Sequence, residues 1–287
     1  WIYLSDSIKD TGLLQYMDIR KCDAEELMDS LTKDSLDLVL TDPPYIISRN
    51  SGMNDLHDIV HGGSDPQHTE EEWGVYSTAK APREFSVTEK DNWIRWGSTL
   101  GKKYAVKTQY GEWDKNFTME KLEKVLSASY KKLRKGGTII VWFDIWKIGE
   151  LKAMLEKLKF KQIRFIEWIK TNPQPLNSGV NYLTNCREIA LLAVKGGKPT
   201  FNSKYDNGIY NFPIMGGKHK IHPTQKNLGL FKALVEKHSN PGDAICDPFL
   251  GSGTTARAAM ELGRTFVGSE LDENFITHAH SWTSIES

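Results

Sequence analysis

The sequence predicts a doubly wound α/β sheet with helices on both of its faces. Two observations lead to this fold class: strand patterns alternate with helix patterns along the chain, and a glycine-rich turn joins a strand to a helix near the C-terminus. The chain contains no internal repeat and no low-complexity tract. A single domain over residues 1–287 is therefore expected, with inserted loops at about 46–112 and 195–221.

The individual elements follow from hydrophobic periodicity. Short apolar runs bounded by turn residues predict strands, and longer stretches with one apolar face predict helices. The expected strands are Met17–Cys22, Leu36–Leu40, Thr138–Phe143, Phe160–Ile169, Glu188–Val194, Ala244–Cys246 and Thr265–Gly268. The expected helices are Ala24–Leu31, Thr118–Leu133, Ile145–Leu158, Leu228–His238 and Thr254–Leu262. Polar sequence without clear periodicity, at about 46–92 and again at 195–226, is expected to form loops.

Composition narrows the class of protein. The chain has 37 basic and 37 acidic residues, so any surface for nucleic acid has to be local. Three cysteines far apart in the sequence, Cys22, Cys186 and Cys246, fit a reducing compartment better than a disulfide framework. No apolar run is long enough for a membrane helix, and the first residues lack a secretory signal pattern. We therefore expect a cytoplasmic protein.

The glycine-rich turn is the first candidate binding site. Gly251, Gly253 and Ala256 fit the pattern G-x-G-x-x-A between a strand and a helix, where backbone N–H groups face a ligand. Glu270 follows the next strand, where a carboxylate can accept hydrogen bonds from ribose hydroxyls. Taken alone, the turn is compatible with a nicotinamide cofactor, a flavin, S-adenosylmethionine or a purely structural role.

The loop Asp42-Pro43-Pro44-Tyr45 is the candidate catalytic centre. It ends the apolar strand before it, and its prolines stiffen the backbone. An exocyclic amine of a nucleobase is a poor nucleophile because its lone pair is delocalised into the ring. The Asp42 carboxylate and the Pro43 carbonyl can accept hydrogen bonds from that amine and localise the lone pair. The Tyr45 ring can stack on a base that has left its helix.

These two motifs resemble those of a known family. Asp42–Tyr45 resembles the catalytic motif of the DNA amino-methyltransferases, and Asp247-Pro248-Phe249-Leu250-Gly251-Ser252-Gly253-Thr254 resembles their S-adenosylmethionine motif. The catalytic motif comes first, an order similar to that of the β group. The resemblance implies a Rossmann-like methyltransferase sheet with circularly permuted motifs, S-adenosylmethionine as cofactor and DNA as partner. It also implies that the inserted loops recognise the target sequence.

Further stretches extend the resemblance to the cofactor site. His222-Pro223-Thr224-Gln225-Lys226 resembles the family segment before the cofactor motif, although Asn227 stands where the family has Pro. Asp23 occupies the place of a residue that faces the cofactor's adenine. The implied cofactor site comprises Asp23, Asp42, His222, Thr224, Lys226, Asp247, Phe249, Gly251, Ser252, Gly253, Thr254 and Glu270. Trp168 resembles a family residue near the target pocket but is expected to be a core residue.

A basic stretch with interleaved aromatic residues is the candidate DNA surface. The residues expected to contact DNA are Lys170, Lys198, Lys204, Lys218 and Lys220, with Phe201, Tyr205, Tyr210 and Phe212 among them. The alternative is an ordinary solvated loop. His57, His61 and His68 match no ligand spacing, and methyl transfer from a sulfonium needs no metal, so no metal site is expected.

The favoured function is methylation of adenine N6 in DNA. Asp42 in the first catalytic position favours adenine, because the cytosine N4 enzymes of the family more often carry Ser there. Three alternatives remain open: cytosine N4 methylation, a dinucleotide-dependent oxidoreductase, and a DNA-binding module without catalytic activity. Because members of this group often dimerise, a homodimer is also possible.

Overall fold

The computed structural model describes residues 16–44, 68–79, 84–96, 117–173, 186–215 and 225–284. The chain divides into two compact units. Unit 1 comprises Trp1–Tyr45, Phe117–Pro173 and Asn185–Ser287, and unit 2 comprises Ile46–Asn116 and Gln174–Thr184. The candidate site residues that the structure describes all belong to unit 1.

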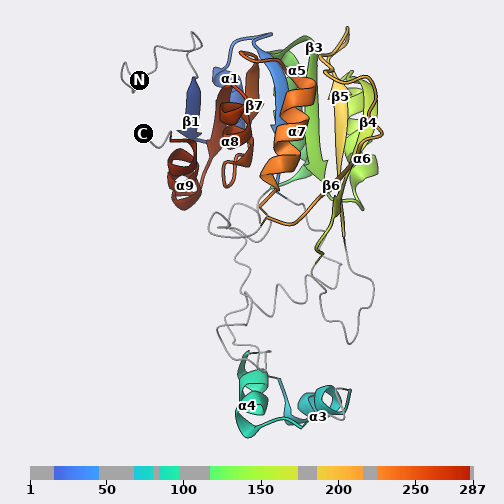
Figure 1. The fold of residues 1–287 in the computed structure, drawn as a ribbon, viewed down its shortest axis with the longest axis vertical. Helices are drawn as coiled ribbons and strands as arrows, with labels where there is room; N and C mark the ends of the chain where they lie inside the picture. The colour runs from blue at the N-terminus through green and yellow to red at the C-terminus, as the bar shows by residue number, and fades with distance from the viewer. Residues whose placement is uncertain are drawn as a thin grey trace. The chain divides into compact units, whose positions relative to one another are not determined.

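The described part of unit 1 is built on one sheet of eight strands (Figure 1). The strands are β1 (Met17–Lys21), β2 (Leu36–Thr41), β3 (Leu133–Phe143), β4 (Lys161–Lys170), β5 (Arg187–Val194), β6 (Ile209–Phe212), β7 (Ala244–Asp247) and β8 (Thr265–Glu270). Their order across the sheet is β1-β8-β7-β2-β3-β5-β4-β6. All neighbouring pairs are parallel except those of β5, which runs against both β3 and β4.

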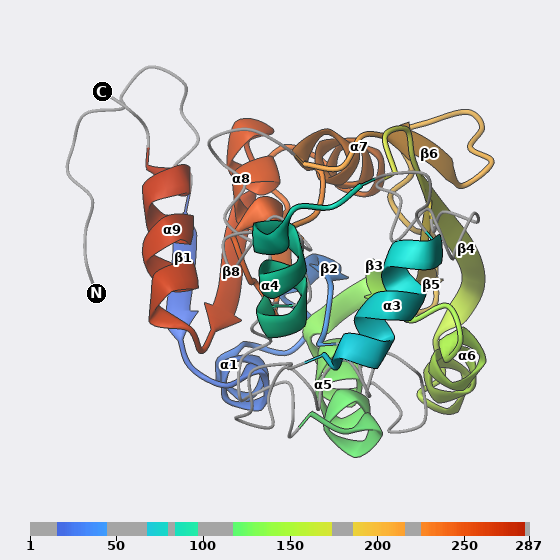
Figure 2. The same ribbon diagram turned by 90° about the horizontal axis from the view of Figure 1, so that it is seen from below.

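Helices cover both faces of this sheet, as Figure 2 shows. Helices α7 (Leu228–His238), α8 (Thr254–Glu261) and α9 (Glu273–Thr283) lie on one face. Helices α1 (Ala24–Ser30), α5 (Met119–Lys132) and α6 (Ile148–Lys157) lie on the other. The predicted doubly wound α/β architecture is therefore confirmed, and it explains why the central strands are almost entirely apolar.

A hydrophobic core joins the sheet to α7 and α8. Alternate strand residues face this layer, among them Leu38 and Leu40 of β2 and Trp142 of β3, and they cluster with Leu230 and Phe231 of α7. The Trp142 ring stacks on Phe231 with a centroid distance of 6.2 Å. Trp168 is 1% exposed, so its predicted role as a core residue is confirmed. The candidate site lies on this same face, at the carboxyl ends of the parallel strands.

The order of the strands fixes where a ligand can bind. From β7 the chain passes through α8 to β8 on one side of the sheet, whereas β2 is followed along the chain by β3 on the other side. Strands β2 and β7 are direct neighbours and parallel, so their carboxyl ends lie together at the point where the strand order reverses. Open α/β sheets bind ligands at such a switch point. The Asp42 loop follows β2 and the glycine-rich turn follows β7.

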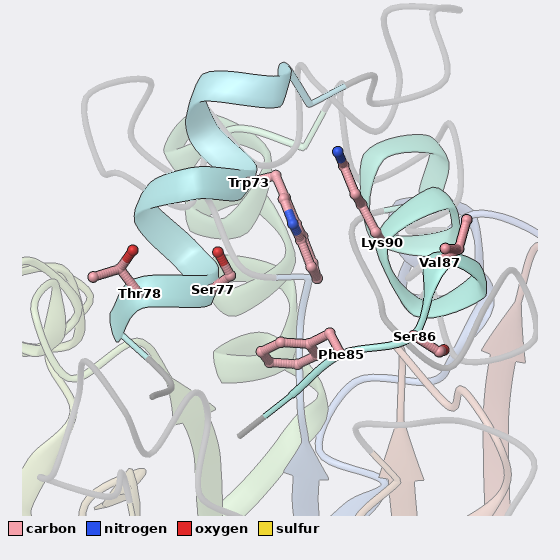
Figure 3. Close-up of a pocket in the computed structure, with 7 residues that line it drawn as sticks. All are labelled: Trp73, Ser77, Thr78, Phe85, Ser86, Val87 and Lys90. Carbon is pink, nitrogen blue, oxygen red and sulfur yellow. The ribbon is translucent and has the colours of Figure 1, made fainter. Parts of the chain in front are cut away.

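The described part of unit 2 is a pair of helices, α3 (Glu70–Ala79) and α4 (Val87–Trp96), held by aromatic rings. The Trp93 ring stacks on His68 at 4.1 Å and on Tyr76 at 4.8 Å, and Trp73 meets Phe85 edge to face. An open pocket between the helices is drawn in Figure 3 and is lined by Trp73, Ser77, Thr78, Phe85, Ser86, Val87 and Lys90. Its lining includes no residue of the candidate active site.

Four elements differ from the sequence prediction. The expectation of a loop at about 46–92 is wrong where α3 and α4 form. Each of these helices starts with a reciprocal capping box, Thr69 with Glu72 and Ser86 with Glu89, a local signal that outweighs weak periodicity. Strand β6 lies within the segment expected to be loop-rich; it forms by parallel pairing with β4 and is itself the edge strand. Helix α9 was not predicted, although Asp272 caps it.

No helix in the described ranges combines the length and apolar character needed to cross a membrane.

Candidate active site

Asp42 follows β2 directly, so its position is fixed by the most central part of the sheet. One carboxylate oxygen, Oδ2, lies 2.9 Å from the ammonium nitrogen of Lys226. The other oxygen, Oδ1, is buried and accepts no hydrogen bond within the described ranges. A buried acceptor without a donor costs about 1–3 kcal/mol. Burial raises the pKa of Asp42, Lys226 opposes this rise, and the nearby Glu188 carboxylate adds to it.

Lys226 belongs to a chain of alternating charges. Its Nζ donates to Glu188 Oε2 at 2.6 Å as well as pairing with Asp42, and its side chain is only 5% exposed. The second oxygen of Glu188 accepts from Lys170 Nζ, also at 2.6 Å. Burial alone would raise the pKa of Glu188, but Lys226 and Lys170 together lower it. The resulting order is Asp42, Lys226, Glu188, Lys170, two carboxylates and two ammonium groups; we call it the charge chain.

The pleat of the sheet explains how these groups meet. Glu188 lies opposite Trp168 in the pairing of β5 with β4, and Lys170 is two residues further along β4. Alternate residues share one face of a sheet, so Glu188 and Lys170 lie on the same face as Trp168, beneath α7. Lys226 lies two residues before that helix, whose N-cap is Asn227. The ammonium groups of Lys226 and Lys170 lie over the rings of Trp142 and Trp168, 5.7 and 5.4 Å from their centroids.

Asp247 ties the glycine-rich turn to the Asp42 loop. Its carboxylate accepts hydrogen bonds from Thr41 Oγ1 at 2.7 Å and from Thr255 Oγ1 at 2.6 Å. The N–H of Phe249 donates to the same carboxylate at 3.1 Å. Burial raises the pKa of Asp247 to about 7, although these three donors favour the ionised form. One buried side chain therefore sets the spacing between the two motifs.

The turn itself needs glycine at two positions. Gly253 caps α8 with φ +91°, and a Cβ there would approach Ala279 of α9 to 2.8 Å. Gly251 has φ +54°, and no described residue lies within 4 Å of the place where its Cβ would be, so among the described residues the backbone borders open space. A ligand can approach the backbone closely there.

Glu270 ends β8 beside this open space. Its Oε2 accepts from the Gly251 N–H at 2.9 Å, and its Oε1 accepts from the N–H groups of Leu271 and Asp272. Burial raises the pKa of Glu270, against these backbone donors. The carboxylate thus shapes the turn, and its remaining lone pairs can accept further donors.

Comparison with known proteins identifies the family. A family model described as DNA methylase, named for N6 and N4 methyltransferases, matches residues 36–281, most of the chain. The chain belongs to this DNA methylase family. The matched range contains both the Asp42 loop and the glycine-rich turn, in that order.

Curated relatives align with nearly the whole methylase. The type II methyltransferase M2.DpnII of Streptococcus pneumoniae is 27% identical over 286 residues, covering 92% of this chain and 88% of the relative. The type II methyltransferase M2.MboI of Moraxella bovis is 27% identical over 269 residues, covering 88% of this chain and 81% of the relative.

Solved structures share the fold of the methylase. A crystal structure of an M1.HpyAVI–SAM complex has a TM-score of 0.61 and 24% identity, covering 94% of this chain and all of that one. The cytosine-N4-specific PvuII DNA methyltransferase has a TM-score of 0.62 and 15% identity, covering 96% of this chain and 88% of that one. At these identities the likeness concerns the fold.

The structure brings most of the described candidate residues of the methylase to one edge of the sheet, the edge formed by the carboxyl ends of its parallel strands. Asp23 follows β1 and caps α1, with its carboxylate accepting from the Glu25 N–H at 2.7 Å. The other described candidates at this edge are Asp42, Pro43, Pro44, Lys170, Lys226, Asp247, Phe249, Gly251, Ser252, Gly253, Thr254 and Glu270. The candidates Tyr45, His222, Thr224, Lys218 and Lys220 lie outside the described residues.

Two lysines predicted to contact DNA lie elsewhere. Lys198 and Lys204 are in the segment between β5 and β6, which begins at the opposite edge of the sheet because β5 is antiparallel. In the same segment Asn202 binds the carbonyls of Glu236 and Ser239, at the C-terminal end of α7. The structure therefore does not bring Lys198 and Lys204 together with Asp42.

Glu188, Thr41 and Thr255 were missed by sequence reasoning. Glu188 reads as the polar start of an apolar strand, and only the antiparallel pairing with β4 places it beside Lys170. The two threonines look like ordinary strand and helix residues. Their roles depend on contacts with Asp247 that span 206 and 8 residues of sequence.

Proposed function

We propose that this DNA methylase transfers a methyl group from S-adenosylmethionine to the N6 amino group of adenine in DNA, with Asp42 at the catalytic centre. The observation that carries the proposal is the geometry of Asp42. Its Oδ2 is held by Lys226, whereas its Oδ1 is buried and has no donor among the described residues, at the end of the sheet where ligands bind. An exocyclic amine is a donor of the right kind for this oxygen.

The chemistry assigned to the protein is positioning and electrostatics. The Asp42 carboxylate accepts a hydrogen bond from the amine and draws its nitrogen toward a tetrahedral state with a localised lone pair. The two prolines after Asp42 keep the acceptor in place, and the Pro43 carbonyl is a second candidate acceptor. When bound, S-adenosylmethionine supplies a methyl group on a sulfonium, which departs as a neutral thioether. As its new N–C bond forms, the amine nitrogen releases one proton to solvent.

The residues around the glycine-rich turn fit such a cofactor. The open space over Gly251 allows a close backbone approach, and the Glu270 carboxylate beside it is suited to ribose hydroxyls. Asp23, at the end of β1, is the residue we assign to the adenine of the cofactor. His222 and Thr224 remain candidates from their place in the sequence motif.

The DNA partner is proposed from the family and from the site. Lys170 lies at the catalytic edge and is the described lysine that we retain as a DNA contact. Lys218 and Lys220 remain candidates from the sequence. We further propose that the enzyme acts on DNA in the cytoplasm of a prokaryote, in keeping with its bacterial relatives, and that inserted segments recognise the target sequence. The homodimer expected from the family resemblance is part of this proposal.

Adenine is preferred to cytosine because Asp stands in the first catalytic position. The fold does not decide between them, since a cytosine-N4-specific enzyme has a similar fold. Cytosine N4 is therefore the alternative target within the same reaction.

Transfer of a labelled methyl group tests the proposal. Unmethylated genomic DNA incubated with the protein and methyl-labelled S-adenosylmethionine should become labelled. In parallel, calorimetry should detect binding of S-adenosylhomocysteine and none of NAD. Binding of NAD without label in DNA would point to the oxidoreductase alternative, and cofactor binding without label would point to an inactive module.

A further inference from the structure

The charge chain contains one member to which the proposed reaction gives no task. Asp42 is assigned to the amine, Lys226 pairs with Asp42, and Lys170 is the lysine retained as a candidate DNA contact. Within the described residues, Glu188 makes no hydrogen bond to Asp42 or to the glycine-rich turn, yet it binds both lysines at 2.6 Å. Burying a carboxylate at the start of an apolar strand has a desolvation cost, even when two cations bind it. We therefore expect its geometry to serve a role in the site.

The geometry shows what the protein would lose without Glu188. An ammonium group with a single carboxylate partner directs its charge and its hydrogen bonds to that carboxylate alone. With Glu188 present, Lys226 divides its hydrogen bonds between two carboxylates and is fixed between them. Asp42 therefore keeps one oxygen for Lys226 and a second, electron-rich oxygen for another donor.

We propose that Glu188 is a positioning residue for methyl transfer: it anchors Lys226 so that the ammonium orients Asp42 without neutralising it as an acceptor for the amine. Since this role rests on the proposed methyl transfer, it concerns the rate of that reaction rather than its existence. Glu188 is a positioning residue and not a catalytic one, because it acts through Lys226.

The charged groups that face Asp42 give this role a specific signature in the pH profile. Lys226 favours the ionised form of Asp42, whereas Glu188 opposes it, and Lys170 acts only through Glu188. The Asp247 carboxyl also interacts with Asp42, and its own pKa is raised to about 7. Asp42 has to be ionised to accept from the amine. Removing the negative charge of Glu188 should therefore shift the acid limb of kcat to lower pH, and removing the positive charge of Lys226 should shift it to higher pH.

The test compares kcat against pH at saturating substrates for wild type, Glu188→Gln and Lys226→Met. Glu188→Gln should lower the plateau of kcat by roughly 10- to 100-fold, the cost of misplacing a catalytic group. Its acid limb should lie below that of wild type, and the limb of Lys226→Met above it. Loss of a merely structural contact would not move the two limbs in opposite directions.

Glu261→Gln is the matched control. Glu261 also bridges two cations, Lys232 at 2.7 Å and Arg257 at 2.6 Å, but it lies at the far end of α8. This variant should keep the wild-type kcat and pH profile. Thermal unfolding and calorimetry with S-adenosylhomocysteine check that each variant is folded and binds cofactor.

The outcomes separate this role from the proposed function. An active wild type with a Glu188→Gln variant of equal kcat and unchanged acid limb would overturn the role of Glu188 alone. A wild type that transfers no methyl group to DNA would overturn the proposed function instead. If Glu188→Gln does not fold, Lys170→Met, which removes the other anchor of Glu188, should still lower kcat, and an unchanged rate would count against the charge chain.

Discussion

At the scale of single residues, the site is defined by what each buried carboxylate is bonded to. In the described part of the chain, Asp42 has one oxygen without a donor, whereas Asp247 accepts from three donors. Both are aspartates at strand ends, and the sequence alone predicted a site role for both. Their different tasks follow from contacts over long sequence separations, which a motif does not contain.

Asp42→Asn tests the role of the open oxygen. The amide keeps the shape of the carboxylate but removes its charge and weakens it as an acceptor. We expect kcat to fall by roughly 100- to 1000-fold, as when one preorganised electrostatic contact is lost. S-adenosylhomocysteine should still bind, because Asp23, Glu270 and the glycine-rich turn are unchanged in this variant.

Asp34→Asn is the control for that variant. Asp34 pairs with Lys195 at 2.6 Å, away from the catalytic edge, and Asn tolerates its φ of +57°. Its rate of methyl transfer should equal that of wild type. Equal rates for both variants would exclude Asp42 as the catalytic carboxylate.

Asp247 should make stability depend on pH. Its pKa of about 7 in the folded protein lies above the usual value for Asp, so between the two values the folded protein binds more protons than the unfolded chain. The stability from this group is complete below the unfolded pKa and is lost as pH rises through about 7. Relative to wild type, Asp247→Asn should gain up to about 3 kcal/mol of unfolding free energy between pH 5 and pH 8.

Denaturant unfolding at both pH values measures this difference. The variant cannot titrate at this position, so the difference between variant and wild type isolates the one carboxyl group. A difference that is the same at pH 5 and pH 8 would show that Asp247 stays ionised throughout.

At the scale of elements, the candidate site residues lie at the ends of strands, next to the starts of the helices that follow. The central strands and the helices α7 and α8 are predictable from sequence because apolar periodicity and turn residues agree there. Helices α3 and α4 escape a periodicity argument because their apolar faces are short, although their capping boxes are visible in the sequence. Strand β6 is four residues long and depends on its partner β4, so no local sequence pattern predicts it.

The junction between the glycine-rich turn and α9 can be tested by paired alanine substitutions. Gly253→Ala adds a Cβ at a positive φ and brings it to 2.8 Å from Ala279. Gly263→Ala adds a Cβ at φ +72° that has no neighbour within 4 Å in the described ranges. The second variant should lose about 1–2 kcal/mol from backbone strain alone, and the first should lose more.

Calorimetric unfolding of both variants gives the difference between their free energies of unfolding. Gly253→Ala should also weaken cofactor binding, because α9 or the turn has to move to relieve the contact. Equal stability for the two variants would mean that α9 does not constrain the turn.

At the scale of the whole molecule, the doubly wound sheet brings together motifs that lie about 200 residues apart in sequence. Asp42 follows β2 and Asp247 ends β7, yet the strands are neighbours and the hydroxyl of Thr41 joins them over 206 residues. The fold class and the two motifs were predictable from the sequence. The partnership of Lys226 with Asp42 and Glu188 was not, because it arises only when α7 and β5 pack at one edge of the sheet.

The most direct test of adenine N6 methylation at Asp42 is to identify the methylated base. DNA without prior methylation is incubated with the protein and S-adenosylmethionine that carries a deuterated methyl group, then digested and resolved by mass spectrometry. We expect the deuterated methyl on N6 of deoxyadenosine with wild type and almost none with Asp42→Asn. Deuterated methyl on N4 of deoxycytidine without any on adenine, or equal labelling by both proteins, would contradict it.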